Sequence, residues 1–92
     1  MPATVVGLVT PHLLRIVDLA NQAETGVNVD WHVREAVATS MREMSDQYNA
    51  SVLVAAYIDG LESAAGQAAR TRVGYVRVLK AGIEAARLLR RD

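Results

Sequence analysis

The chain has 92 residues, of which 51% are hydrophobic and 22% charged, and its ten basic and ten acidic side chains cancel. This length allows one domain, residues 1–92, and is too short for two independent cores. The absence of cysteine excludes disulfides and thiolate sites and favours a cytoplasmic location. The longest apolar run, residues 52–58, is far shorter than the roughly 20 residues that cross a bilayer. We therefore expect a soluble domain with no membrane partner.

The N-terminal segment of residues 4–9 is short, uncharged and rich in β-branched side chains. Thr10 can cap a helix, and Pro11 fits a first helical position. The pattern therefore predicts a short strand followed by a helix that begins at Pro11. The alternative is a single helix from Ala3 with a kink at Pro11, because short apolar runs do not separate strand from helix by periodicity.

Two amphipathic helices follow in the first half of the chain, residues 1–48. Residues 11–24 repeat apolar side chains at steps of three and four, and Gly26 stands where a C-terminal cap is expected. A second stripe predicts a helix over residues 31–48, with Asn28 and Asp30 as candidate N-caps. The apolar positions of the two stripes are Leu13, Ile16 and Leu19, then Val33, Val37, Met41, Met44 and Tyr48.

In the second half, residues 49–92, apolar side chains again recur at helical spacing. This pattern predicts helical segments over residues 51–70 and 71–91, with Ser51 as a candidate cap. The pattern leaves open whether these are two helices or one long rod. Glycines inside a helix cost about 1 kcal/mol each relative to alanine. We expect most of them to allow close helix packing and one break to lie near residues 66–74. The predicted fold is thus mainly α, a small four-helix domain with or without an N-terminal strand.

No motif in the sequence predicts catalysis, a cofactor or a metal. His12 and His32 are the only groups that titrate near neutral pH, and both fall at the starts of predicted helices without metal-ligand spacing. A Gly-rich phosphate loop and a nucleophile elbow are also missing. We therefore expect a protein that is not an enzyme.

The residue usage bears on the source of the protein. Nine of the ten basic residues are Arg, and Phe is absent. This bias is typical of genes rich in GC codons and favours a bacterial or phage source.

The most specific pattern is the run GVNVDWHVREAV at residues 26–37. It resembles the ribbon-helix-helix family of small dimeric regulators and antitoxins, in which a glycine, an apolar residue and a small polar residue precede a capping Ser or Asp and then Arg-Glu-Ala-apolar. The likeness covers residues 3–44. Membership would imply a homodimer whose N-terminal strands pair as a ribbon and whose helices share a core. The core and dimer positions would then be Leu13, Ile16, Leu19, Val33, Ala36, Val37, Met41 and Met44.

The same resemblance would assign contacts with DNA. In the family the outward side chains of the ribbon, here Thr4, Val6 and Leu8, read bases, and the start of the second helix, here Asn28 to Asp30, binds a phosphate. None of these ribbon residues carries the amide or guanidinium group that reads adenine or guanine. This departure favours association with protein over sequence-specific DNA binding.

Two other readings of the sequence remain. A helix-turn-helix over residues 64–79 would use Arg70, Arg72, Arg77 and Lys80 as phosphate contacts. A helical adaptor, or a phage-encoded inhibitor of a host protein, would contact its partner through Met41, Met44 and Tyr48 or through Arg87, Arg90 and Arg91. We expect a small non-enzymatic regulator that acts by protein association and forms a homo-oligomer, with DNA as the alternative partner.

Overall fold

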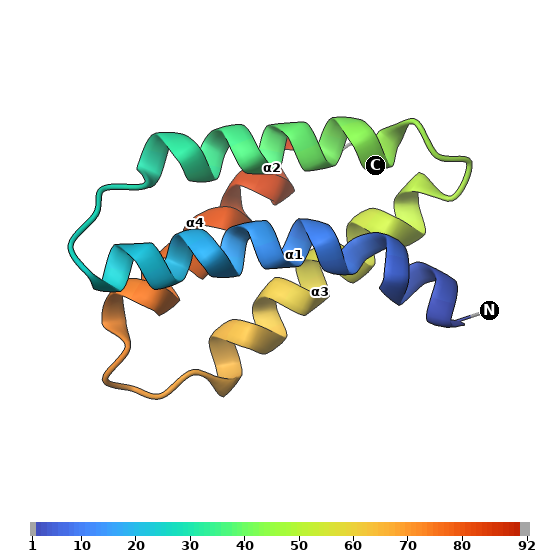
Figure 1. Cartoon of the computed structure of the whole chain (residues 1–92). Coiled ribbons are helices and arrows are strands. Elements are labelled where there is room, and N and C mark those ends of the chain that lie inside the picture. Colours follow the sequence, from blue (N-terminus) through green and yellow to red (C-terminus); the bar gives the residue numbers. More distant parts are fainter. Residues whose placement is uncertain (1, 91–92) are drawn as a thin grey trace.

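A computed structural model describes residues 2–90, with side chains from Val5 onward. The chain forms four helices, α1 (Pro2–Glu24), α2 (Asp30–Ser45), α3 (Ala50–Gln67) and α4 (Val73–Leu89), and no strand occurs within residues 2–90. Figure 1 shows that the α1–α2 and α3–α4 loops lie at one end of the molecule and the α2–α3 loop at the other. The predicted mainly α, four-helix architecture is confirmed. Among the described helices none is long and apolar enough to span a membrane.

The predicted N-terminal strand is wrong, because residues 4–9 belong to the long helix α1. The apolar face of α1 runs without interruption through Pro11, with Val9 and Ile16 buried and Val5 packed against the core. An internal proline costs a helix about 3 kcal/mol, whereas burial of one aliphatic side chain contributes about 1.5–3 kcal/mol. The Thr10 hydroxyl donates to the Val6 carbonyl oxygen at 2.6 Å, a bond of the kind that often accompanies a bend in a helix. The first turns of α1 bend away from the rest of the helix (Figure 1).

The ends of α1 and α2 follow the predicted signals only in part. Gly26 has a φ of +92° and donates its N–H to the Ala23 carbonyl at 3.1 Å, so it ends α1 as predicted. The Asn28 side chain accepts a hydrogen bond from the Asp30 N–H at 3.1 Å, just before α2. The prediction that Tyr48 belongs to the buried stripe is wrong. Because α2 already ends at Ser45, Tyr48 lies in the following loop and is fully exposed.

The two predicted helices of the second half are separate. A break over residues 68–72 divides α3 from α4, which is where the glycines predicted it. Ser51 lies inside α3, and Asn49 occupies the N-cap position without a capping hydrogen bond.

Close packing explains most glycines of α3 and α4. A Cβ on Gly60 would lie 2.7 Å from a methyl group of Leu13, and one on Gly82 would lie 3.4 Å from Ile16. A Cβ on Gly74 would lie 3.5 Å from the carbonyl oxygen of Ala23. These contacts hold α1 closely against both α3 and α4.

A single core lies between the four helices. It contains Ile16 from α1, Val37 from α2, Tyr57 and Leu61 from α3 and Leu79 from α4, each without solvent exposure. Each helix packs against the other three. The core thus draws on the whole chain, and the surfaces that remain outside it are the ones available for function.

Candidate functional site

The residues predicted as core or dimer contacts lie inside one chain. Ile16, Val33, Val37, Met41 and Met44 are buried in the core, and Leu13, Leu19 and Ala36 are half-buried and pack against it. Their burial needs no second copy of the chain. The homo-oligomer therefore stays a prediction, which light scattering at micromolar concentration would test.

The predicted partner contacts are scattered over the surface. Val6 and Leu8 are exposed on α1, but residues two apart on a helix point in different directions. Asp30 and Arg77 come within 4.0 Å of each other. Arg87 pairs with Glu62, and Arg90 ends α4 by donating its N–H to the Ala86 carbonyl. The Thr4 side chain and all of Arg91 lie outside the described residues. Asn28 and Asp30 line one shallow hollow together, whereas Arg77 and Arg87 line two hollows that adjoin each other.

A small polar cluster is enclosed where α1, α2 and α3 meet. His12 Nδ1 lies 2.8 Å from the Ser40 hydroxyl, and the His12 ring meets the Tyr57 ring edge-on with centroids 6.3 Å apart. Ser40 and Tyr57 have no solvent exposure, and the Tyr57 hydroxyl forms no hydrogen bond with any described group. Burial raises the pKa of Tyr57 to about 12, and the neighbouring Ser40 lowers this pKa by a smaller amount. Burial also lowers the pKa of His12.

No hollow described in the structure is lined by His12, Ser40 or Tyr57. Within residues 2–90 there is also no group of three His, Asp or Glu side chains that could hold a metal. We interpret the cluster as a polar element of the packing.

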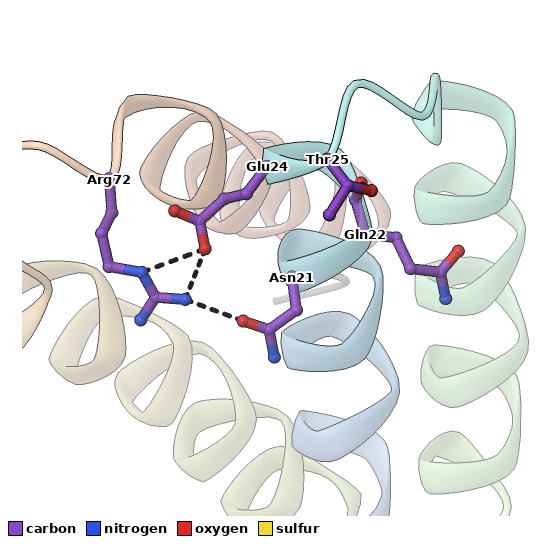
Figure 2. A network of polar contacts seen from close by, with 5 residues as sticks. All are labelled: Asn21, Gln22, Glu24, Thr25 and Arg72. Carbon is purple, nitrogen blue, oxygen red and sulfur yellow. Dashed lines mark hydrogen bonds and ion pairs between the residues drawn. The ribbon is translucent and has the colours of Figure 1, made fainter.

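Arg72 organises one end of the molecule. Its guanidinium donates to Glu24 through Nε at 3.1 Å and through Nη2 at 2.6 Å, and to the Asn21 side chain at 2.7 Å. Figure 2 shows how these three side chains join the end of α1 to the α3–α4 loop. The guanidinium carbon also lies 3.8 Å from the ring centroid of Tyr75. Hydrogen bonding to Arg72 lowers the pKa of Glu24. Arg72 is thus paired within the fold, and its contacts join α1 to the α3–α4 loop.

Two hollows of the described surface adjoin each other between α3 and α4. They have volumes of about 630 and 730 Å³ and share Ala65, Val76, Lys80 and Glu84. We call this continuous depression the α3–α4 groove. Its complete lining is Glu62, Ala65, Gly66, Ala68, Ala69, Arg70, Val73, Val76, Arg77, Lys80, Ala81, Ile83, Glu84 and Arg87.

The two sides of the groove differ in size and charge. Small residues line the α3 side, whereas α4 supplies larger apolar side chains and three cations, Arg77, Lys80 and Arg87. The Arg87 charge is neutralised by Glu62, and Arg77 makes a 4.0 Å pair with Asp30 in which both side chains are about two-thirds exposed. Such an exposed pair contributes little. Arg70 and Lys80 make no ion pair with any described residue.

The groove spans a length that suits a segment of another protein. Its α4 side runs from Val73 to Arg87, and the 14 steps between these residues at about 1.5 Å each give about 21 Å. The candidate contacts from the sequence include four residues of the groove, Arg70, Arg77, Lys80 and Arg87. The groove itself could not be identified from the sequence, because a groove of this kind forms only where two helices pair. The usable signal was the helical spacing of Val73, Val76, Lys80 and Arg87 on one face.

No protein-family model, curated protein or solved structure matches this chain.

Proposed function

We propose that the protein is a small non-enzymatic regulator that acts by binding a partner protein in the α3–α4 groove. The observation that carries this proposal is an open groove about 21 Å long with an apolar floor, beside Arg70 and Lys80, which make no ion pair with any described residue. Val73, on the edge of the groove, is 71% exposed, which places a sizeable apolar side chain where a partner could cover it.

The composition of the groove favours protein over nucleic acid. A DNA-binding surface gains most of its affinity from cations that neutralise phosphates. Here Glu62 and Glu84 lie among the cations, and the floor between them is apolar. Apolar side chains have no partner on a phosphate backbone, whereas a protein segment offers both apolar and charged groups.

The experiment uses two matched valines. Val73→Glu places a carboxylate in the groove, and Val52→Glu places one outside it, in the first turn of α3 at the other end of the molecule (Figure 1). Both valines lie in the first turn of a helix and are more than half exposed, and a carboxylate there is compatible with the helix dipole. Both variants should therefore fold like the wild type.

Affinity capture from the source cell with the wild type and the two variants tests the proposal. A protein partner that the wild type and Val52→Glu retain, and that Val73→Glu loses, supports binding in the groove. Equal retention by all three proteins would contradict it. Recovery of nuclease-sensitive nucleic acid in place of a protein would favour DNA binding instead.

A further inference from the structure

We propose that the segment of the partner bound in the α3–α4 groove is an acidic amphipathic α-helix whose backbone passes close to Gly66. This inference rests on the proposed function and adds the chemistry and shape of the bound segment. Three features of the groove carry it, namely its charge, the absence of backbone groups able to pair with a strand, and a glycine that the fold itself does not require.

The charge of the groove selects an acidic partner. Lys80 and Arg70 are exposed and unpaired within the described chain, and Arg77 makes only a loose exposed pair. Against these cations the groove sets Glu84, while Glu62 is neutralised by Arg87. An excess of positive charge therefore remains beside the apolar floor. Acidic side chains on a partner would complement it, and basic ones would be repelled.

The walls of the groove favour a helix over an extended segment. Apart from residues 68–70 of the α3–α4 loop, the walls are α-helices, whose interior backbone groups are already hydrogen-bonded within each helix. A strand laid here would find no backbone edge to pair with, and its own N–H and C=O groups would lose water without compensation. A helix satisfies its backbone internally and presents an apolar face to the floor. About 21 Å of groove accommodates roughly 14 residues, or four turns.

Gly66 marks the point of closest approach. It lies in the last turn of α3, its φ is not positive, and a Cβ built on it would meet nothing within 4 Å. Gly60 and Gly82, in contrast, face neighbouring side chains of the chain itself. A helical glycine costs up to about 1 kcal/mol relative to alanine. Since no neighbour in the fold needs the space above Gly66, we infer that the bound helix uses it.

Three synthetic 14-residue peptides serve as probes. The first is amphipathic, with leucine and alanine on one face and glutamate flanking it. The second carries lysine in place of each glutamate, and the third has the composition of the first in an order without an apolar face. Nuclear magnetic resonance titration of the ¹⁵N-labelled protein reports both affinity and location. We expect only the first peptide to bind, with shifts at groove residues and with affinity that falls as salt rises.

Matched variants test the contacts. Gly66→Leu should weaken the first peptide by about tenfold or more, the equivalent of 1.4 kcal/mol, without loss of thermal stability. Gly7→Leu is its control, because Gly7 is also helical with open space above it but lies outside the groove. Lys80→Glu should weaken binding similarly, whereas Arg34→Glu, which reverses an exposed cation on α2, should not.

The outcomes separate this inference from the proposed function. One outcome is that a protein partner binds the wild type but not Val73→Glu, while the acidic peptide binds no better than the other two peptides. In that case the proposed acidic helix is wrong, and the proposed binding of a partner in the groove stands. If neither a groove-dependent partner nor peptide binding is found, both fail. Equal effects of Gly66→Leu and Gly7→Leu would refute the close approach. Self-association of the pure protein through groove residues would show that the occupant is a second copy and overturn the inference.

Discussion

A single added methyl group should affect stability differently at two glycines of the same helix, raising it at Gly66 and leaving it unchanged or lower at Gly60. Gly66→Ala gains the helix propensity of alanine, up to about 1 kcal/mol, because its new Cβ enters open space. Gly60→Ala gains the same propensity, but its Cβ would lie 2.7 and 2.9 Å from the two methyl carbons of Leu13. Forcing a methyl into a packed contact typically costs about 1–3 kcal/mol, so the net effect ranges from neutral to a loss of about 2 kcal/mol.

Thermal unfolding followed by circular dichroism measures this difference. For a domain of this size 1 kcal/mol moves Tm by roughly 4–8 °C, so Gly66→Ala should melt several degrees above the wild type and Gly60→Ala at or below it. Shortening Leu13 to Ala in the Gly60→Ala background should remove the conflict and reveal favourable coupling between the two changes. Equal stabilisation by both single variants, or additive effects in the double variant, would refute the packing argument.

Three further changes probe the core. Val37→Asp places a carboxylate at a position with no solvent exposure. It should lower the free energy of unfolding by several kcal/mol and abolish cooperative melting. An unchanged Tm would show that the buried face of α2 lies elsewhere. Tyr57→Phe removes a buried hydroxyl without a hydrogen bond and should raise the free energy of unfolding by about 1 kcal/mol in urea titrations; a loss of similar size would reveal a partner for that hydroxyl. Burial lowers the pKa of His12, so the folded state favours the neutral imidazole. The resulting contribution to folding stability is fully present above the ordinary pKa of about 6.5. It is lost as the pH falls through the lower pKa of the folded state. The urea midpoint should therefore fall with acidification below about pH 6.5 in the wild type and in the control His32→Gln. The fall should be smaller in His12→Gln, and an identical pH profile in all three proteins would contradict the assignment to His12.

Helical periodicity in the sequence predicted the parts of the fold that depend on local pattern. The stripe from Val33 to Met44 is the buried face of α2, and Gly26 ends α1 because only its left-handed backbone closes that turn. These features depend on neighbours within a few residues. They are therefore visible in a single sequence.

The continuous N-terminal helix was only the alternative to a strand in the sequence analysis, because local preferences opposed the tertiary packing. β-branched residues followed by Pro11 favour a strand and then a helix start. However, Val5, Val9, Leu13 and Ile16 already repeat at steps of four, four and three. That spacing could have identified a continuous helix, and burial of Val9 in the core is what offsets the proline.

The candidate site was only partly predictable. Arg77 and Arg87 were candidates as isolated cations, but the groove that they line forms only where α4 pairs with α3. The role of Gly66 was also hidden, since a glycine that permits internal packing and one that leaves an outer surface open look alike in sequence. Only the space around each glycine distinguishes them.

The packing of α1 against α4 also affects how the protein can fold during synthesis. Gly74 meets Ala23, and Gly82 meets Ile16, so the first helix depends on contacts with the last. Between Glu24 and Val73 the ribosome must add 49 residues, which takes about 2–10 s at roughly 5–20 residues per second. During that interval the apolar face of α1 lacks the helix that covers it. The nascent chain therefore passes through a stage in which its first helix can be captured by a chaperone or by a neighbouring chain.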